Sequence, residues 1–566
     1  MNYIVKNGYK NHKLASLKQY DFCIQHDAFI PKNWLIPCRV FAFRYHSCGC
    51  FAFYQFSLSV CKASLRRYDA PGRRGHLDRG GFARRRSLHV KNVLEHNHKN
   101  ICCVRAFCKQ NSLYTLIFIL QTMHTAQKNL TILTILVKLI HYMRRKGENS
   151  MAKKRNIIVG QSGGPTSVIN SSLAGVYKNA IERGFDKVYG MLHGIQGLLD
   201  EQYIDLSTQI HSELDIELLK RTPSAFLGSC RFKLPEIHED KSIYEKIFDI
   251  LNRLDIYAFI YIGGNDSMDT IKKLSDYAIL TGQTQKFLGV PKTIDNDLAL
   301  TDHTPGFGSA AKYIGASTKE VIRDAQGLTY KKSMITIMEI MGRNAGWLTG
   351  ATALARTEDC DGPDLIYLPE VPFDIDKFLI KVKDLLKKKS SVVIAVSEGI
   401  RLADGRYVCE LGSSGDYVDA FGHKQLAGTA TYLANFLAAE CGCKTRAVEL
   451  STLQRSASHM ASRVDIDEAF MVGGAAVKAA DEGDTGKMIV IDRVSDDPYM
   501  AKTGIYDVHR IANEEKVVPR NWMNKDASYV TKDFVDYISP LIQGDYQPIM
   551  VNGLPRHLVL NLKKKR

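Results

Sequence analysis

The sequence predicts an α/β fold with parallel, doubly wound sheets. Short, continuous apolar runs recur after residue 151, and a turn rich in glycine or charged residues follows each of them. Helical patterns then separate these strands from one another. Apolar strands that alternate with helices are typical of parallel sheets covered by helices on both faces. Such sheets bind ligands beyond the carboxyl ends of their strands, where these turns are expected to lie.

The first strand–turn–helix unit occupies residues 156–180. Residues 156–159 (Asn-Ile-Ile-Val) predict a short buried strand, residues 160–166 a glycine-rich turn, and the positions from Ser167 to Ala180 a helix. This order directs backbone N–H groups and a helix N-terminus at an anion. An ordinary tight turn remains an alternative, because a single Gly-Gly-Pro is weak evidence for a binding site.

Two further units repeat this arrangement. Residues 258–262 predict a strand, residues 263–267 (Gly-Gly-Asn-Asp-Ser) a turn, and the positions from Met268 onward a helix. Another apolar strand at residues 392–396 leads into Ser397-Glu398-Gly399. We expect these turns to meet at the carboxyl edges of the sheets.

The most informative segment is Gly-Val-Pro-Lys-Thr-Ile-Asp-Asn-Asp at residues 289–297, which follows an apolar run typical of a strand. It places Lys292, Thr293, Asp295 and Asp297 within six residues. One aspartate can accept a proton, another can hold magnesium, and the lysine can face phosphate oxygens, so the segment suits phosphoryl transfer. A charged turn without chemistry is the alternative reading of so short a match.

Charge and cysteine divide the chain at about residue 150. Residues 1–150 hold 25 Lys and Arg against 6 Asp and Glu, a balance of +19, whereas residues 151–566 hold 51 against 54, a balance of −3. The first part also holds 8 of the 13 cysteines. The five later cysteines show no disulfide or zinc spacing, which favours a reducing, cytoplasmic location.

Residues 1–150 are not predicted to form a domain. They lack a sustained period of 2 or 3.6, and their apolar stretches at 113–120 and 130–140 are too short to span a bilayer. A nucleic-acid-binding arm is the alternative, given Arg84-Arg85-Arg86 and nearby aromatics, but no known module surrounds them. The sequence at 144–148 (Arg-Arg-Lys-Gly-Glu) resembles a translated ribosome-binding site upstream of Met151. We therefore expect residues 1–150 to be a non-native or disordered extension.

A set of motifs in residues 151–566 resembles the phosphofructokinase family. Each motif is short, but seven of them occur in the family's order, and together they cover nearly all of the chain after Met151. They are Ser162-Gly163-Gly164 with Asn170, Phe226 to Arg231, Gly263-Gly264-Asn265-Asp266-Ser267, Thr293-Ile294-Asp295-Asn296-Asp297, Met341-Gly342-Arg343, Ser397-Glu398-Gly399, and Arg446 with Arg455.

Two positions within these motifs bear on the phosphoryl donor. Family members that use ATP have glycine where this chain has Asp266 and Lys292, and this pair resembles the pyrophosphate-dependent branch. An aspartate would fill the space of a nucleotide's α-phosphate. Two like charges about 4 Å apart cost on the order of 4 kcal/mol at an effective dielectric near 20. Lysine offers the opposite charge to compact pyrophosphate. A surface ion pair between the two residues is the alternative.

The resemblance also implies roles for individual residues. Asp295 would be the general base toward the 1-hydroxyl of fructose 6-phosphate, and Arg231 would neutralise charge on the phosphate in the transition state. Thr293 would help to hold the sugar or the transferred group, and Lys292 would face the pyrophosphate. Gly163, Gly264 and Asp266 would bind the phosphoryl donor and determine which donor is used. The sugar-phosphate pocket would consist of Thr293, Ile294, Asp295, Met341, Gly342, Arg343, Glu398, Arg446, Thr452 and Arg455.

The resemblance implies Mg²⁺ as the cofactor, with Asn265 and Asp297 near the metal. Asn265 stands where the family usually has aspartate, and its amide oxygen is a weaker ligand than a carboxylate. Thr452 replaces a histidine of bacterial ATP enzymes. Met334 replaces an arginine that reaches a neighbouring subunit's substrate in those enzymes, which puts that arrangement in doubt here.

The expected architecture is two Rossmann-like lobes with the active site between them. The donor lobe would comprise residues 151–311 completed by 454–566, and the sugar-phosphate lobe residues 312–453. Fructose 6-phosphate and pyrophosphate are the expected partners, without nucleic acid or membrane, in a homodimer or homotetramer. An ATP-dependent enzyme and a non-catalytic regulatory subunit are the alternatives; the latter would be expected to lose Asp295 or Arg343, and both are present.

Overall fold

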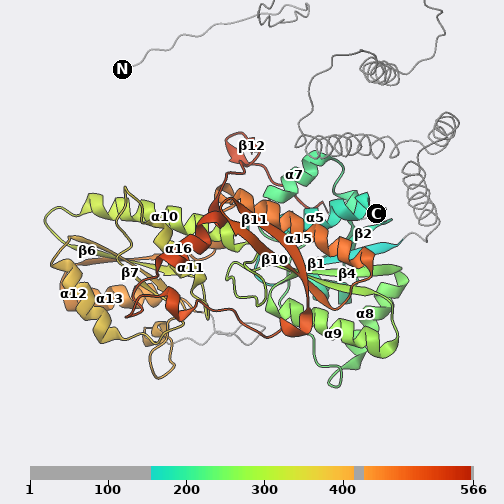
Figure 1. Ribbon diagram of the computed structural model, residues 1–566, viewed down its shortest axis with the longest axis horizontal. Helices are drawn as coiled ribbons and strands as arrows, with labels where there is room; N and C mark the ends of the chain where they lie inside the picture. The colour runs from blue at the N-terminus through green and yellow to red at the C-terminus, as the bar shows by residue number, and fades with distance from the viewer. Residues whose placement is uncertain (1–154, 413–425, 562–566) are drawn as a thin grey trace, which may run out of the picture. The chain divides into compact units, whose positions relative to one another are not determined.

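The computed structural model describes residues 155–412 and 426–561. The expectations for residues 1–150, including a native start at Met151, lie outside the described residues. Two sheets organise the described chain, and helices lie on both faces of each sheet (Figure 1). The predicted α/β fold with doubly wound sheets is confirmed.

The first sheet has seven strands in the order β11-β10-β5-β4-β1-β2-β3. Pairing is parallel from β10 through β5, β4 and β1 to β2, and an antiparallel strand closes each edge. The order of the strands reverses between β1 and β4, so ligand-binding turns are expected beyond these two strands. The strands are β1 (Asn156–Gln161), β2 (Val188–Met191), β3 (Tyr203–Asp205), β4 (Ile256–Gly263), β5 (Lys286–Pro291), β10 (Lys487–Asp496) and β11 (Tyr499–Asp507).

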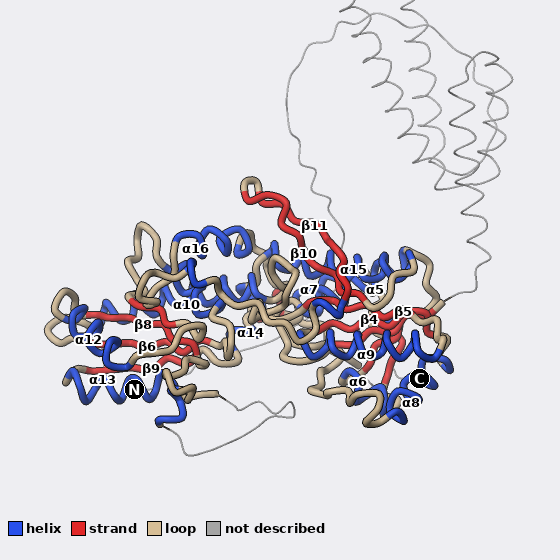
Figure 2. The backbone as a smooth tube through the Cα atoms, turned by 60° about the horizontal axis from the view of Figure 1, so that its bottom comes forward, coloured by secondary structure: helices blue, strands red, loops and turns tan. Residues whose placement is uncertain are grey.

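Helices cover both faces of this sheet because its central strands are apolar on both sides. Ile157 and Val159 of β1 point into one core, and Ile158 between them points into the other. The first core lies under α5 (Ile169–Glu182), α7 (Glu213–Arg221) and α15 (Arg463–Glu482). The second lies under α6 (Gly194–Leu199), α8 (Lys241–Arg253) and α9 (Asn265–Thr281). Figure 2 shows the strands between these two layers.

The second sheet is entirely parallel, with the order β7-β8-β6-β9. Its strands are β6 (Met334–Ile340), β7 (Leu365–Tyr367), β8 (Ser391–Ser397) and β9 (Lys444–Glu449). One face packs on α10 (Phe307–Leu328), α11 (Trp347–Gly350) and α16 (Lys532–Ile538), and the other on α12 (Ile375–Leu386) and α13 (Thr429–Cys441).

Short elements complete the described chain. α14 (Leu453–Ser456) follows β9, and β12 (Met550–Val551) pairs with β13 (Leu554–Pro555). The 3₁₀ turns are Leu206–Thr208, Ala351–Ala355, Val408–Leu411, Ser458–Met460, Val508–Arg510, Arg520–Trp522 and Ser539–Ile542.

The C-terminal stretch serves both sheets. β10 and β11 extend the first sheet, whereas Val518, Phe534 and Leu541 pack in the core of the second. The division into residues 151–311 with 454–566 and 312–453 therefore remains a proposal.

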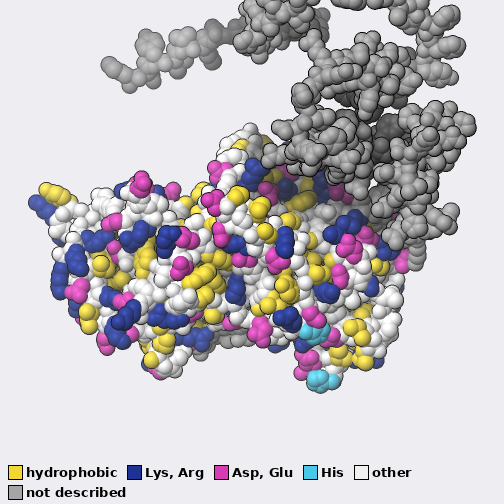
Figure 3. Space-filling view, viewed as in Figure 1, with side chains coloured by type: hydrophobic (Ala, Val, Ile, Leu, Met, Phe, Trp, Pro, Cys, Tyr) yellow, Lys and Arg dark blue, Asp and Glu magenta, His cyan; other side chains and the backbone are white. Residues whose placement is uncertain are grey.

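The surface of the described chain carries both signs of charge. Lys and Arg side chains are interspersed with Asp and Glu across the face seen in Figure 3. Within residues 155–412 and 426–561, no helix combines the length and the apolar character needed to cross a membrane.

Candidate active site

The predicted turns meet at the carboxyl edge of the first sheet. Ser162 after β1 donates its backbone N–H to the Ile262 carbonyl of β4 at 2.9 Å, and Lys292 after β5 donates its N–H to the Gly263 carbonyl at 3.0 Å. The turns after β1, β4 and β5 are therefore joined directly by backbone hydrogen bonds. This convergence is the one expected of a parallel sheet.

A cavity of about 320 Å³ lies beyond the carboxyl ends of β6 and β8. This volume is at the lower end of the range for small-ligand sites, about 300–1,000 Å³. Three arginines and three glutamates lie in its wall, so it offers donors to a phosphate and acceptors to hydroxyl groups, which suits a phosphorylated polyol. Six predicted residues line it: Arg231, Met341, Arg343, Glu398, Thr452 and Arg455; the remaining lining residues are Glu339, Ile340, Leu426, Ala427, Glu449, Ser451 and Gln454.

Two glycines shape the wall of this cavity. The backbone of Gly342 has a φ of +133°, and its N–H donates to Glu398 Oε1 at 3.3 Å. A Cβ at Gly399 would lie 2.0 Å from the Arg343 carbonyl oxygen, so only glycine allows the turns after β6 and β8 to approach this closely. Burial raises the pKa of Glu398 to about 7, so this carboxyl can accept or donate a hydrogen bond near neutral pH.

Lys292 lies buried beneath the glycine turn after β1. Its Nζ donates to the Gly164 carbonyl at 2.8 Å, and only 3% of the residue is exposed. A Cβ at Gly163, whose φ is +73°, would stand 3.2 Å from this Nζ. Burial lowers the pKa of Lys292 to about 8, although Asp295 and Asp297 oppose the shift. The surface ion pair with Asp266 does not form, because Lys292 is buried and Asp266 is exposed in the first turn of α9.

Asp295 lies near cationic side chains from the loops of both sheets. Its backbone N–H donates to Thr293 Oγ1 at 3.0 Å, which fixes the turn. Burial raises its pKa, while the nearby cations Lys292, Arg343 and Arg455 act in the opposite direction. Arg455 also lies beside the β1 turn, since a Cβ at Gly164 would be 3.4 Å from its Nη1. Thus Arg455 borders both the cavity and the glycine turn.

The two residues predicted to lie near the metal, Asp297 and Asn265, have different surroundings. One carboxylate oxygen of Asp297 is buried without a hydrogen-bond partner, and burial beside Asp295 raises the pKa of Asp297 to about 7. Both features suit a cation in contact with this oxygen. Asn265 instead accepts from the Asn513 N–H at 2.6 Å and donates to the Glu514 carbonyl at 3.0 Å. Its side chain is thus bound to the C-terminal loop.

Several other predicted residues lie elsewhere than expected. Arg446 does not reach the cavity: it is on β9, partly exposed, and pairs with Asp324 of α10 at 2.8 Å. Gly163, whose backbone is predicted to face the donor, donates its N–H to the Cys230 carbonyl at 3.1 Å. Ile294 packs into the core of the second sheet. Gly264 is the N-cap of α9, consistent with a donor-facing turn.

Sequence reasoning missed Lys516, which holds the loop after β5. Its Nζ donates to Asn296 Oδ1 at 3.2 Å and to the Asp302 carbonyl at 2.7 Å, and its backbone N–H donates to the Asp297 carbonyl at 2.8 Å. The Trp347 indole N–H of α11 donates to the Lys516 carbonyl at 2.9 Å. Lys516 therefore links the turn at residues 293–297 to α11, which packs on the second sheet. In the sequence, Lys516 precedes Val-Val-Pro and belongs to no recognisable motif, so nothing there indicates a role at the site.

Comparison with known proteins agrees with this geometry. A family model described as phosphofructokinase matches residues 156–479. The chain belongs to the phosphofructokinase family.

Within this family, two curated relatives bear the name pyrophosphate–fructose 6-phosphate 1-phosphotransferase. The protein of Halomonas elongata is 40% identical over 416 residues, which cover 73% of this chain and 97% of the relative. That of Xanthomonas campestris pv. campestris is 42% identical over 407 residues, covering 72% and 96%. The crystal structure of a pyrophosphate-dependent phosphofructokinase from Nitrosospira multiformis matches with a TM-score of 0.65 and 36% identity, covering 72% of this chain and 96% of that one.

Proposed function

We propose that this chain is a pyrophosphate-dependent phosphofructokinase. It transfers a phosphoryl group from pyrophosphate to the 1-hydroxyl of fructose 6-phosphate, giving fructose 1,6-bisphosphate and phosphate, and it catalyses the reverse reaction. The observation that carries the proposal is the buried ammonium of Lys292 beneath the turn after β1. The names of relatives that are 40% and 42% identical support it.

The sugar phosphate occupies the arginine-lined cavity in this proposal. Arg343 and Arg455 bind the 6-phosphate, and Glu398 accepts from ring hydroxyls. The Nε of Arg455 is buried without a hydrogen-bond partner, so it has a free donor for a phosphate oxygen.

Proton and phosphoryl transfer then occur next to Asp295. The 1-hydroxyl oxygen attacks the near phosphorus of pyrophosphate, Asp295 takes the hydroxyl proton, and the bond from that phosphorus to the bridging oxygen breaks. The leaving phosphate carries the bridging oxygen and its electron pair. Arg231 neutralises charge on the transferred group, since it lies near both Asp295 and Asp266.

Donor choice follows from the charges of two positions. Lys292 is placed to neutralise the leaving phosphate, whereas Asp266 presents a carboxylate in the first turn of α9 where a nucleotide's α-phosphate would extend. Repulsion on the order of 4 kcal/mol corresponds to about a thousandfold loss of affinity for ATP. This difference favours pyrophosphate.

Mg²⁺ is the proposed cofactor, and Asp297 with the pyrophosphate oxygens would hold it. The orphan buried oxygen of Asp297 supports this assignment. When bound, the metal neutralises developing charge on the phosphates. Within the described residues, no cluster of three or more His, Cys, Asp or Glu side chains is arranged to bind a metal, which is consistent with a site completed by the substrate.

We also propose a cytoplasmic homodimer or homotetramer. The five cysteines of the described chain are free thiols, consistent with a reducing compartment.

Product identification tests this function. The full chain is incubated with fructose 6-phosphate, Mg²⁺ and pyrophosphate, and ³¹P NMR follows the phosphates. We expect fructose 1,6-bisphosphate and phosphate to appear in equal amounts, and the reverse mixture to regenerate pyrophosphate. Pyrophosphate hydrolysis without sugar phosphorylation would contradict the proposal, and inertness toward every phosphoryl donor would favour a regulatory subunit.

A further inference from the structure

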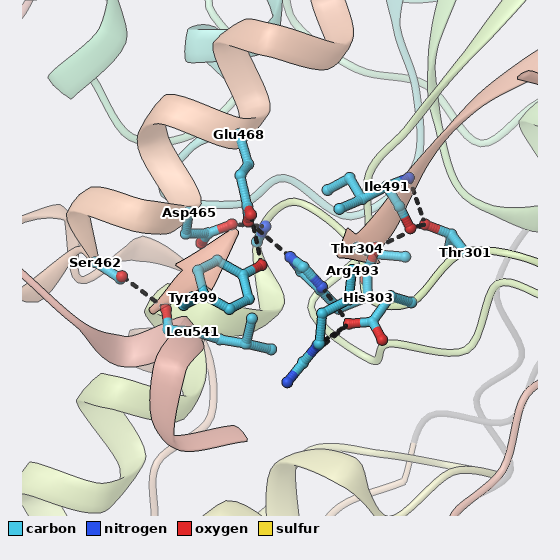
Figure 4. A network of polar contacts seen from close by, with 12 residues as sticks. Thr301, His303, Thr304, Ser462, Asp465, Glu468, Ile491, Arg493, Tyr499 and Leu541 are labelled. Carbon is cyan, nitrogen blue, oxygen red and sulfur yellow. Dashed lines mark hydrogen bonds and ion pairs between the residues drawn. The ribbon is translucent and has the colours of Figure 1, made fainter. Parts of the chain in front are cut away.

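A layer of charged side chains and one tyrosine, buried or half-buried, lies behind the turn that carries Asp295. We call this set, His303, Asp302, Glu468, Arg493 and Tyr499, the charged layer. Figure 4 shows Glu468 of α15 beside His303, with Tyr499 of β11 directed at Glu468 and Arg493 of β10 nearby, where it pairs with Asp302. The residues therefore come from elements far apart in the sequence. None of them was among the predicted site residues.

His303 stands between two carboxylates, one on each ring nitrogen. Its Nδ1 lies 2.8 Å from Asp302 Oδ1 and its Nε2 lies 2.7 Å from Glu468 Oε2, with 1% of the side chain exposed. A neutral imidazole donates from one nitrogen only, so an imidazolium is required to donate to both carboxylates. These carboxylates raise the pKa of His303 to about 9 against the effect of burial.

The rest of the charged layer balances this charge. Arg493 donates to Asp302 Oδ1 through Nε at 3.0 Å and Nη2 at 2.9 Å, and Tyr499 donates to Glu468 Oε1 at 2.6 Å. Two cations thus face two carboxylates. Buried ion pairs add little stability compared with apolar side chains of similar volume, so their presence here is better explained by the geometry they impose.

The segment after His303 forms the back of the Asp295 turn. Thr304 Oγ1 donates to the Thr293 carbonyl at 2.8 Å, and the Thr304 N–H donates to Asn296 Oδ1 at 3.2 Å. The Thr293 N–H donates to the Pro305 carbonyl at 3.3 Å. Residues on both sides of Asp295 are therefore held by residues 304 and 305.

Helix α15 fixes the same segment at a second point. Asp465, three residues before Glu468, accepts from the Gly306 N–H at 2.8 Å and the Ser309 N–H at 2.9 Å, where α10 begins. His303 and Gly306 are thus anchored to one helix on either side of Thr304. Displacement of His303 would be transmitted to Thr293 and Asn296.

We propose that His303 is a positioning residue for phosphoryl transfer. Held as an imidazolium between Glu468 and Asp302, it sets the position of residues 301–306 and, through Thr304, that of the 293–297 turn. The expected effect on kcat rests on the proposed function, whereas the contacts and the protonation of His303 do not. The titratable and charged groups around His303 are Asp302 on its own segment, Glu468 of α15, Arg493 of β10 with its second partner Asp496, Tyr499 of β11, Tyr537 of α16 and Lys516 of the C-terminal loop.

The kinetic test compares His303→Gln with His509→Gln. His509 is a matched control because Asp507 and Asp276 also bracket its two nitrogens, at 2.7 Å and 2.9 Å, but at a partly exposed site. For His303→Gln we expect kcat to fall about 10–100-fold, the loss typical of a misplaced reacting group, with both KM values within about threefold of wild type. His509→Gln should keep kcat within about twofold.

Unchanged kcat in folded His303→Gln would overturn the proposal, because a merely structural role would lower the melting temperature alone. If His303→Gln does not fold, Glu468→Gln carries the same test: it keeps the shape and removes the charge opposite His303. We expect the same fall in kcat, and wild-type kcat in this variant would overturn the proposal.

NMR supplies a readout independent of activity. With ¹⁵N-histidine labelling of the full chain, the resonances that disappear in His303→Gln, or that shift in Glu468→Gln because the partner of Nε2 has changed, identify His303. We expect both ring nitrogens to be protonated at pH 7.5 and to remain so until the pH approaches 9. A neutral ring at pH 7.5 would overturn the proposal even in an active enzyme. A protonated ring in a chain inactive with pyrophosphate would sink the proposed function and leave the imidazolium assignment standing.

Discussion

Replacing Lys292 by Met should weaken the use of pyrophosphate without removing the sugar-phosphate cavity. Met has a similar length and fills the buried space, but it lacks the ammonium that donates to the Gly164 carbonyl at 2.8 Å. Lys292 does not line the cavity, so binding of fructose 6-phosphate should change little. We therefore expect the loss in kcat/KM for pyrophosphate.

The size of this loss follows from the position of the charge. An ammonium about 4 Å from a phosphate charge contributes on the order of 4 kcal/mol at an effective dielectric near 20, which is about a thousandfold. The lost hydrogen bond to the part-buried Gly164 carbonyl adds a stability cost on the order of 1 kcal/mol. We predict a fall in kcat/KM of about 10²–10³-fold.

The pH dependence gives a second, independent signature. The pKa of Lys292 is lowered to about 8, so the ammonium is present below this pH and is lost as the pH rises through it. The ratio of wild-type to Lys292→Met kcat/KM for pyrophosphate should therefore be largest at pH 6–7 and decline through about pH 8. Taking the ratio cancels the titration of pyrophosphate itself.

The control is Lys273→Met, at another buried lysine. Lys273 of α9 donates to the Leu234 carbonyl at 2.9 Å and pairs with Asp269 at 2.8 Å, and it does not line the cavity. This variant should lose stability and keep its kcat/KM for pyrophosphate within about threefold. Equal kinetic effects in the two variants, or a pH-independent ratio for Lys292→Met, would refute the reasoning.

Three further changes test the other parts of the site. Asp295→Asn should lower kcat about 10²–10⁴-fold with little change in either KM, as expected for loss of a general base; activity near wild type would exclude that role. Gly399→Ala places a Cβ 2.0 Å from a backbone oxygen of the loop after β6 and should raise the KM for fructose 6-phosphate, whereas Gly327→Ala, where a Cβ meets open space, should be neutral in the same assay. Asp266→Gly combined with Lys292→Gly should raise the use of ATP relative to pyrophosphate; ATP turnover at background in the folded double variant would show that further residues exclude the nucleotide.

The layered α/β architecture and the turns after the strands could be predicted from the sequence, because short apolar runs and the glycines next to them specify these elements locally. The apolar run at residues 258–262 and the glycines after it specify β4 and the start of α9, although the helix begins at Asn265, three residues earlier than predicted. The antiparallel edge strands were not predicted. β11 is only partly buried, so its pattern lacks the continuous apolar run of a central strand.

Side-chain partners distant in the sequence could not be predicted. The amide of Asn265 is used by Asn513 and Glu514, about 250 residues away, and nothing near Asn265 indicates this. In the sequence His303 is an ordinary histidine next to an aspartate, because its second carboxylate partner, Glu468 of α15, is 165 residues away. Arg446 carried the family's motif, yet its place on β9 directs it to Asp324.

The ratio of kcat/KM for pyrophosphate to that for ATP tests the donor assignment most directly. Both are measured on one preparation of the full chain, with saturating fructose 6-phosphate and Mg²⁺. Repulsion by Asp266 and neutralisation by Lys292 predict a ratio on the order of 10³ or more. A ratio below one would contradict the assignment of Lys292 and Asp266 as the residues that select pyrophosphate.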